Sequence, residues 1–382
     1  MKKSLRDLQQ DILLTLIKPL VYIWMWLDAK CKIHIGKGVD FNRKEPFIML
    51  ANHTFMFDVI HVPLRFKKFP FIIGSQTLFT EYPIKFFVTH VAHVISKAKG
   101  RSDLITIKHI YEVVKKGYPI LIFPEGDTTF YGETGYIEES TMKLIKKLEL
   151  DVITCNVKGG YLSKPRWATG KRRNHRIELF YNLTIKKDEV KELNTNEIST
   201  IINKALYNND YLYQKNKMIP HPGKKLAEGL ENIIYVCPFC ESINSIETEK
   251  NNIKCNVCGH EGHIDKFGFI HDFKFDNLIS WNEYQLKFSD KLKKSKIETK
   301  GFLYLIKMKN RAKIPVGKVI VEYNNNVISI SGAYILDIPI TEIQNPTVTL
   351  RSDFGFIYND VHYLINLDKF SAVFLRIVQD KY

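Results

Sequence analysis

A histidine and an acid five residues apart form the first candidate for chemistry in this 382-residue chain, within Asn52-His53-Thr54-Phe55-Met56-Phe57-Asp58. Neutral imidazole is the side chain best suited to remove a proton near pH 7. A nearby carboxylate holds one tautomer and stabilises the imidazolium that forms. With 12 His and 41 acidic residues, about one such spacing is expected by chance, and His260/Asp265 and His271/Asp276 share it. The spacing alone therefore does not identify a site.

The context of His53 separates it from the other pairs. His53 follows a short apolar segment, residues 46–51, which predicts a buried strand that ends just before the histidine. A second polar cluster, Phe123-Pro124-Glu125-Gly126, closes another apolar segment, residues 118–123. Two polar clusters at strand ends in an alternating α/β segment are expected to meet at one edge of a sheet, where such folds place their sites.

With both clusters in this order, the chain resembles the glycerolipid acyltransferase family, the 1-acylglycerol-3-phosphate acyltransferases and their relatives. The signature of that family is Asn-His-x4-Asp followed by Phe-Pro-Glu-Gly, and the resemblance covers roughly residues 33–217. It implies an α/β fold, a mixed-sheet acyltransferase domain with helices around it. It also implies that His53 and Asp58 are catalytic and that Asn52, Glu125 and Gly126 bind substrate, with Glu125 accepting hydrogen bonds from acceptor hydroxyls or orienting basic groups.

The chain departs from the family pattern at two places. Where the family has a strand that ends in Arg, this chain has residues 93–97 ending in Lys97, with Arg101 close behind. By the resemblance, Lys97 and Arg101 hold a phosphate, one as a point charge and the other as a planar fork. Asp127-Thr128-Thr129 stands where many members have Thr-Arg-Ser. These changes leave the acceptor headgroup open, and the alternative reading makes Pro-Glu-Gly a plain turn and residues 97–101 a solvated loop.

The chemistry that the resemblance implies is O-acyl transfer, EC 2.3.1 type, in phospholipid biosynthesis. The donor would be acyl-coenzyme A or acyl-carrier protein, and the acceptor a lysophospholipid similar to lysophosphatidic acid. Moving an acyl group from a thioester to an alcohol requires removal of the hydroxyl proton as the oxygen attacks. No Ser or Cys stands near His53 in the sequence, which favours direct attack by the acceptor over an acyl-enzyme. The oxyanion would need backbone N–H donors from a helix start or a glycine turn.

The N-terminal segment and the net charge bear on location. The formal charge is +15, so an anionic partner is expected; phospholipid, coenzyme A, acyl-carrier protein and nucleic acid all qualify. The apolar stretch 12–27 is interrupted by Lys18-Pro19 and is shorter than the roughly 20 residues of a membrane span. No small-residue cleavage site follows it, so a signal peptide is not expected. Tyr22, Trp24 and Trp26 favour a membrane-surface helix or kinked helix pair in residues 1–32, against the alternative of a buried packing helix. We therefore expect a peripheral or monotopic protein on anionic lipid at the cytoplasmic side of a membrane.

Four of the six cysteines form a pattern typical of a zinc ribbon. Cys237 and Cys240 make one Cys-x2-Cys pair, and Cys255 and Cys258 make a second after fourteen residues. Four thiolates close the coordination of one Zn²⁺, so the metal is predicted to be structural. The alternatives are two chance pairs or a redox couple. The other two cysteines, Cys31 and Cys155, fit no pairing pattern, which suits a reducing compartment.

The expected domains are residues 1–32, the membrane-surface segment; 33–225, the acyltransferase domain; 230–265, the small zinc ribbon; and 270–382, a β-rich C-terminal domain of unknown role. A Pro- and Gly-rich stretch, 217–225, marks one boundary. Helices are predicted at 103–116, 138–148 and 278–292, and C-terminal strands at 302–308, 317–323, 327–331, 347–350 and 355–358. The second hypothesis is a catalytically inactive core whose ribbon engages nucleic acid or protein. The intact His53 and Asp58 argue against it, and nucleic acid is not expected as a partner.

Overall fold

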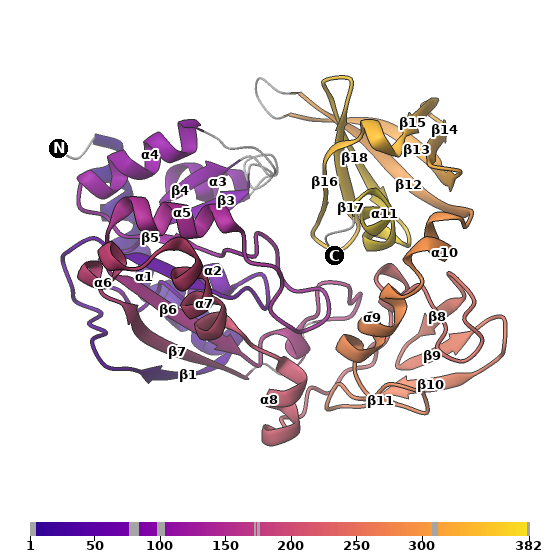
Figure 1. Ribbon diagram of the computed structural model, residues 1–382, viewed down its shortest axis with the longest axis horizontal. Coiled ribbons are helices and arrows are strands. Elements are labelled where there is room, and N and C mark those ends of the chain that lie inside the picture. The colour runs from indigo at the N-terminus through magenta and orange to yellow at the C-terminus, as the bar shows by residue number, and fades with distance from the viewer. Residues whose placement is uncertain are drawn as a thin grey trace. The chain divides into compact units, whose positions relative to one another are not determined.

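The computed structural model describes residues 5–75, 84–97, 104–171, 173, 176–307 and 312–379. The chain divides into two compact units, which are described separately below (Figure 1). Unit 1 contains residues 1–163 and 174–217, and unit 2 contains residues 164–173 and 218–382. The change of unit after Lys217 coincides with the start of the Pro- and Gly-rich stretch.

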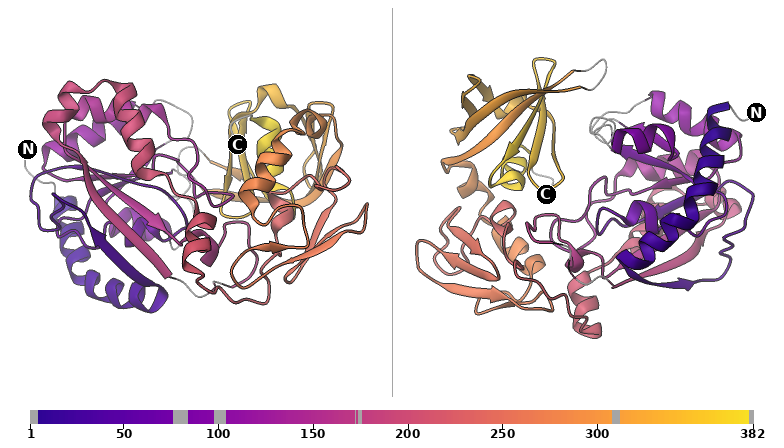
Figure 2. Two further views of the ribbon diagram at one scale, coloured as in Figure 1. Left: turned by 60° about the horizontal axis from the view of Figure 1, so that its bottom comes forward. Right: turned by 180° about the vertical axis from the view of Figure 1, so that it is seen from behind.

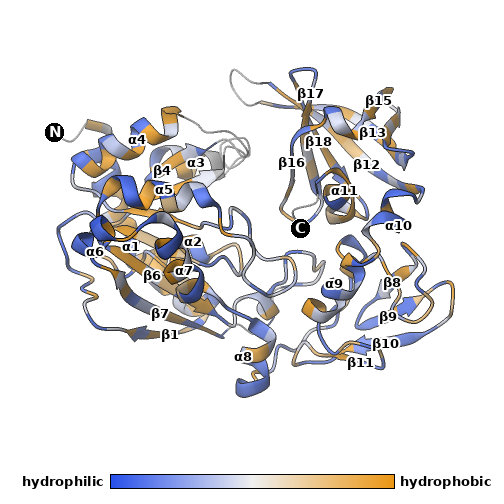
Figure 3. Ribbon diagram, viewed as in Figure 1, coloured by the Kyte–Doolittle hydropathy of each residue, from blue (hydrophilic) through white to orange (hydrophobic). Residues whose placement is uncertain are grey.

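Unit 1 is built on a seven-stranded mixed sheet with the strand order β1-β7-β6-β2-β5-β3-β4. Every neighbouring pair is parallel except β6 and β7. The strands are β1 (Lys30–Ile35), β2 (Ile48–Ala51), β3 (Phe71–Ser75), β4 (Val94–Lys97), β5 (Ile120–Ile122), β6 (Val152–Lys158) and β7 (Arg176–Ile185). The central strands β2, β5 and β6 are apolar and almost wholly buried, as parallel strands covered on both faces must be (Figure 3). This sheet confirms the α/β prediction.

Amphipathic helices cover one face of this sheet. The helix α4 (Leu104–Lys115) buries Thr106, Ile110 and Val113, which recur at helical spacing. The helix ends at Lys115, two residues before the left-handed Gly117 (φ +82°). The same apolar core includes side chains of α5 (Glu139–Leu148) and α7 (Thr195–Leu206). Unit 1 also contains the helices α2 (Asp58–His61), α3 (Ile84–His90), α6 (Lys187–Glu192) and α8 (Asp210–Lys217).

The opposite face of the sheet is covered by residues 55–66 and by the N-terminal segment. Phe55, Val62 and Phe66 share a core with strand residues such as Met49 and Ile153. The N-terminal segment is a single helix, α1 (Leu5–Asp28), with Pro19 inside it. It lies on the side of the sheet away from α5 and α7 (Figure 2).

Unit 2 combines two antiparallel sheets. The ribbon sheet has the order β11-β10-β9-β8, with β8 (Ile246–Glu249), β9 (Asn252–Cys255), β10 (Glu261–Ile264) and β11 (Ile270–His271). The second sheet has the order β15-β14-β13-β12-β18-β17-β16, so a four-strand meander and a three-strand meander join through β12 and β18. Its strands are β12 (Ile297–Ile306), β13 (Lys313–Asn324), β14 (Val327–Gly332), β15 (Leu336–Pro339), β16 (Gln344–Thr349), β17 (Asp353–Tyr358) and β18 (Val361–Leu367). The β-rich prediction is confirmed, although β15 and β18 were not predicted.

The helices of unit 2 differ from the expectation in two respects. The predicted helix 278–292 is two helices, α9 (Leu278–Leu286) and α10 (Ser289–Lys293). Lys287 and Phe288 lie between them and belong to neither helix. The apolar spacing continues through the break, since Leu292 remains buried, and for this reason the pattern alone did not reveal it. A C-terminal helix, α11 (Ser371–Val378), buries Val373, Phe374 and Ile377 and was not predicted.

Candidate functional sites

The two polar clusters of the sequence meet at one edge of the unit 1 sheet. Strands β2 and β5 are parallel neighbours, with Leu50 opposite Ile122, so their carboxyl ends lie side by side. His53 follows β2 and Glu125 follows β5 within three residues of the strand ends. The backbone N–H of Thr129 donates to the His53 carbonyl over 2.9 Å, which ties the second loop to the first. The expected meeting of the two clusters is therefore present in the structure.

His53 and Asp58 form a hydrogen-bonded pair. The distance from His53 Nδ1 to Asp58 Oδ2 is 3.3 Å, and the His53 side chain is 15% exposed whereas that of Asp58 is fully buried. The His53 ring packs on Phe123, with 4.4 Å between the ring centroids. Because Nδ1 faces the carboxylate, the proton is expected on Nδ1, which leaves Nε2 as the basic nitrogen. This arrangement can remove a proton from a substrate hydroxyl.

The Asp58 carboxylate is held by hydrogen bonds from Thr54 and Phe55, which precede it in the same loop. Its Oδ2 accepts the backbone N–H groups of Thr54 (2.6 Å) and Phe55 (3.0 Å) and the Thr54 hydroxyl (3.2 Å). A buried carboxylate requires such partners. Both amides therefore serve to hold Asp58. Oxyanion donors from a helix start or a glycine turn stay a prediction.

Glu125 bridges the two loops through backbone groups. Its Oε1 accepts the N–H of His53 and its Oε2 accepts the N–H of Gly135, each over 2.7 Å. Burial raises the pKa of the Glu125 carboxyl to about 7, while the two N–H donors act in the opposite direction. Each carboxylate oxygen thus has a backbone partner, and Glu125 positions the backbone of His53. Contact of Glu125 with acceptor hydroxyls or basic groups stays a prediction.

Asn52 and Gly126 also serve local geometry. The Asn52 side chain is buried, and it donates to the Val157 carbonyl (2.9 Å) and accepts the Val157 N–H (2.6 Å). It thus joins the end of β2 to β6. Gly126 has φ +76°, a left-handed conformation that favours glycine, and a Cβ there would meet no atom within 4 Å. This open backbone remains compatible with the predicted close approach of a substrate.

The predicted phosphate-binding residues are only partly placed. Lys97 ends β4, and its backbone lies at the same sheet edge as His53, three strands away or roughly 14 Å at the usual strand spacing. Arg101 lies outside the described residues. Binding of a phosphate by Lys97 and Arg101 stays a prediction.

The turn 159–163 packs against the His53 loop. A Cβ on Gly160 would lie 2.0 Å from Thr54 Oγ1, so only glycine fits against the His53 loop. Asp210 is buried and accepts the N–H groups of Gly159 (2.9 Å) and Tyr161 (2.7 Å), and the Tyr161 hydroxyl donates to the Phe130 carbonyl (2.9 Å). No local pattern predicts this, because Asp210 is some fifty residues from the turn that it holds.

The four predicted metal-ligating cysteines converge in unit 2. All four sulfurs lie within 4.8 Å of one another, with 3.8 Å from Cys237 to Cys258 and 3.7 Å from Cys240 to Cys255. Tetrahedral coordination with Zn–S bonds of about 2.3 Å places sulfurs about 3.8 Å apart. The cluster therefore fits one tetrahedral metal ion.

Several polar side chains of helix α1 contact the rest of unit 1, and most of its large apolar side chains are exposed. Asp7 accepts from Lys116 (2.7 Å), and Asp11 pairs with His93 Nε2 (2.9 Å) and accepts the Tyr118 hydroxyl (2.6 Å). Further along the helix, Lys18 donates to the Phe66 carbonyl (2.8 Å) and Tyr22 to the Leu64 carbonyl (3.1 Å). The exposed apolar side chains are Leu5, Leu8, Ile12, Leu13, Leu16, Leu20, Ile23, Trp24, Trp26 and Leu27. This is the reverse of the packing-helix alternative.

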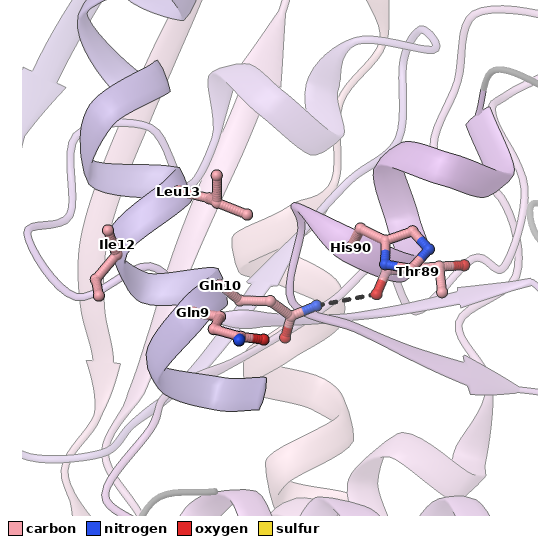
Figure 4. Close-up of a pocket in the computed structure, with 6 residues that line it drawn as sticks. All are labelled: Gln9, Gln10, Ile12, Leu13, Thr89 and His90. Carbon is pink, nitrogen blue, oxygen red and sulfur yellow. Dashed lines mark hydrogen bonds between the residues drawn. The ribbon is translucent and has the colours of Figure 1, made fainter. Parts of the chain in front are cut away.

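An apolar groove of about 700 Å³ lies between the first half of α1 and the end of α3 (Figure 4). It is lined by Gln9, Gln10, Ile12, Leu13, Thr89 and His90. Gln10 holds the two helices together by donating to the carbonyls of Thr89 and Ala92, each over 3.2 Å. The segment Asp7–Asp28 is also long and apolar enough to cross a membrane by length and composition.

Comparisons with known proteins bear on unit 1. An acyltransferase family model matches residues 32–158, which contain His53, Asp58, Glu125 and Gly126. The crystal structure of the 1-acyl-sn-glycerophosphate (LPA) acyltransferase PlsC from Thermotoga maritima is similar with a TM-score of 0.43 and 16% identity, over 54% of this chain and 80% of that chain. A comparison with curated protein sequences finds no match. Residues 32–158 therefore belong to the acyltransferase family, with the motif order of the glycerolipid acyltransferases, and the chain is an acyltransferase.

Proposed function

We propose that this acyltransferase works at a membrane surface and moves a fatty acyl group from a thioester to the hydroxyl of a lysophospholipid similar to lysophosphatidic acid. The observation that carries the proposal is the His53–Asp58 pair, 3.3 Å apart at a sheet edge inside the matched domain. His53 is partly exposed while its partner is buried, as expected for a base that must reach a substrate.

In the proposed reaction, His53 Nε2 takes the acceptor's hydroxyl proton while the hydroxyl oxygen attacks the thioester carbonyl carbon. The carbonyl π electrons move to oxygen, which gives a tetrahedral oxyanion. The oxyanion then reforms the carbonyl as the C–S bond breaks, and the sulfur leaves as a thiolate with the electron pair of that bond. The imidazolium returns its proton to that thiolate, so His53 ends neutral. Asp58 stabilises the imidazolium between these two transfers.

The proposal specifies the acyl donor and the acceptor headgroup only by chemical class. Acyl-coenzyme A and acyl-carrier protein are both anionic, and the +15 charge of the chain favours either. Lys97, at the same sheet edge as His53, and Arg101 are proposed to hold the acceptor phosphate. A point charge at Lys97 tolerates more headgroup shapes than a bidentate Arg would.

The inverted amphipathic helix α1 supports attachment to the cytoplasmic side of a membrane. Its polar side chains contact unit 1 from Asp7 at one end to Tyr22 near the other. A helix held along its length by a water-soluble domain lies in the headgroup layer and does not cross the bilayer. Its outward apolar face would insert into the lipid, and the groove beside α3 would face the lipid. Anionic lipid adds attraction to the basic chain.

We also propose that the Cys237, Cys240, Cys255 and Cys258 cluster holds one structural Zn²⁺. Bound zinc would crosslink the two cysteine hairpins and thereby stabilise the ribbon. Four thiolates fill the tetrahedron, so these residues leave no position for water or substrate.

The experiment is an acyl-transfer panel with full-length protein on vesicles. Acyl-coenzyme A and acyl-carrier protein serve as donors, and lysophosphatidic acid, other lysophospholipids and a simple alcohol as acceptors. We expect transfer to lysophosphatidic acid that is lost in His53→Ala. If no combination of these donors and acceptors gives His53-dependent transfer, the proposed function is wrong.

A further inference from the structure

Residues 207–210 of unit 1 join α7 to α8, and Asp210 is the first residue of α8. We call them the α7–α8 connection. Asn156 in β6 fixes the start of this connection by donating to the carbonyls of Ala205 (3.0 Å) and Tyr207 (2.9 Å). The function proposed above gives these residues no role.

The main chain of the α7–α8 connection holds the loop that carries Glu125. The N–H of Thr134 donates to the Asn208 carbonyl (3.0 Å), and the N–H of Asn208 donates to the Thr134 hydroxyl oxygen (2.9 Å). The next residue, Gly135, donates its N–H to Glu125, whose other carboxylate oxygen accepts the N–H of His53. The connection therefore supports the loop that fixes the His53 backbone.

The Asp210 side chain holds the turn that follows β6. This carboxylate is fully buried, and it accepts the N–H of Gly159 at Oδ1 (2.9 Å) and the N–H of Tyr161 at Oδ2 (2.7 Å). The side-chain amide of Asn208 also donates to Oδ1 (2.8 Å). The N–H of Asp210 itself donates to the Gly132 carbonyl (2.9 Å), which fixes where the carboxylate stands. A buried carboxylate requires such donors, so the turn and Asp210 are held together.

The turn in its place lies against the residues that hold the catalytic carboxylate. Gly160 packs so closely on the His53 loop that a Cβ there would lie 2.0 Å from Thr54 Oγ1 and 2.8 Å from Phe55 Cδ1. The backbone N–H groups of Thr54 and Phe55 both donate to Asp58. A shift of the turn would therefore displace the donors that set the position of Asp58 relative to His53.

We propose that Asp210 is a positioning residue for acyl transfer, which holds the turn 159–161 against the His53 loop and so keeps Asp58 in place. The inference rests on the proposed function, because its kinetic readout is acyl transfer. A displacement of the order of 1 Å at a catalytic group lowers turnover by up to about 100-fold. The bonds of the Asp210 carboxylate go to the turn and to Asn208, and neither is proposed to bind substrate. Loss of this carboxylate should therefore lower kcat by about 10-fold and leave KM unchanged.

The experiment compares Asp210→Asn with Asp151→Asn in the full-length chain. Asp151 is a matched control, because its carboxylate also holds the fold by accepting from the Arg43 side chain (2.8 Å) and from the N–H of Lys187 (2.7 Å). It lies just before the start of β6, whereas the turn follows the end of that strand. Both variants should unfold at a lower denaturant concentration than wild type. Only Asp210→Asn should lower kcat, with KM unchanged.

Amide hydrogen exchange shows whether the effect reaches the catalytic loop. In Asp210→Asn, the amides of Thr54 and Phe55 should exchange faster than in wild type, because the turn no longer holds their loop. The amide of His53 should exchange at the wild-type rate, because its hydrogen bond does not involve the Asp210 carboxylate. Asp151→Asn should leave all three amides unchanged.

A second variant, Gly160→Ala, tests the same contact without changing Asp210. The added methyl group would clash with Thr54, so kcat should fall and the amides of Thr54 and Phe55 should exchange faster. If Asp210→Asn does not fold, Gly160→Ala decides the inference by the same measurements.

The inference is wrong if the amides of Thr54 and Phe55 exchange at the wild-type rate in Asp210→Asn, or if its kcat equals that of Asp151→Asn. An inactive wild type would instead overturn the proposed function. Exchange at Thr54 and Phe55 would then decide whether Asp210 holds the loop.

Discussion

The backbone N–H of His53 donates to Glu125 Oε1 over 2.7 Å. The two residues lie 72 positions apart in the chain, and the bond joins the loop after β2 to the loop after β5. The other Glu125 oxygen accepts from Gly135, so one carboxylate fixes the backbone of His53 to the far side of the loop that carries Glu125. This accounts for a Glu next to Gly126 without assigning it a role in proton transfer.

Glu125→Gln should weaken both the fold and turnover. A Gln offers one acceptor oxygen, and its NH₂ group faces the N–H that the second oxygen had accepted. We expect a loss of about 1–3 kcal/mol in the free energy of unfolding and a fall in kcat of roughly 10-fold or more from misplacement of His53. Denaturant unfolding and single-turnover kinetics measure the two effects. Glu139→Gln, at a residue whose side chain is 77% exposed, is the control and should match wild type.

The raised pKa of Glu125, about 7, predicts how stability depends on pH. A carboxyl with a folded-state pKa above its ordinary value of 4.5 favours folding when protonated. Its contribution is fully present below pH 4.5 and is lost as pH rises through about 7. Relative to Glu125→Gln, the free energy of unfolding of wild type should fall by on the order of 1–3 kcal/mol between pH 5 and pH 8. An unchanged difference across that range would refute the raised pKa.

Zinc content should depend on the four clustered cysteines. Freshly purified protein should contain one Zn²⁺ per chain, because the sulfur separations of 3.7 and 3.8 Å fit tetrahedral coordination. Cys237→Ser should release the metal and speed amide exchange from Val236 to His263. Cys31→Ser, at a thiol outside the cluster, should retain it. Elemental analysis that finds no metal in unchelated wild type would show that the cysteines serve another purpose.

Membrane binding should depend on the outward face of α1. Leu16 and Leu20 are 68% and 67% exposed, so replacing both with Glu should leave the thermal midpoint unchanged. Because burying one such side chain contributes about 1.5–3 kcal/mol in an apolar medium, we expect at least a roughly 10-fold weaker affinity for neutral vesicles. The control is Leu212→Glu, because Leu212 lies in α8 and is 55% exposed. Equal vesicle flotation of both variants would mean that α1 does not face the lipid.

Patterns within short stretches of the sequence predicted those features that depend on residues close together in the chain. The period of apolar residues located α4 and α5, and the apolar runs located β2 and β5. The position of His53 and Glu125 at one sheet edge followed from the same patterns. The Cys-x2-Cys spacing predicted a cluster that the structure brings together.

What escaped prediction depends on contacts between distant residues. The partners of Glu125 are backbone amides, which leave no signature in the sequence. The inward acids of α1 meet Lys116, His93 and Tyr118 about a hundred residues later, so the sequence showed only an interrupted apolar stretch. Arg166 binds the carbonyls of Val348 and Leu350 and Trp167 is buried, and no local period in the sequence marks these contacts.

The most direct test of the account is the turnover of His53→Ala on lysophosphatidic acid with an acyl thioester, beside His271→Ala. His271 also has an acid five residues later, Asp276, but it lies in the ribbon of unit 2. Because the loss of a general base costs roughly 10²–10⁴-fold, His53→Ala should lose that factor in kcat with its unfolding midpoint unchanged. His271→Ala should retain wild-type turnover. Turnover near wild type in His53→Ala would contradict the account.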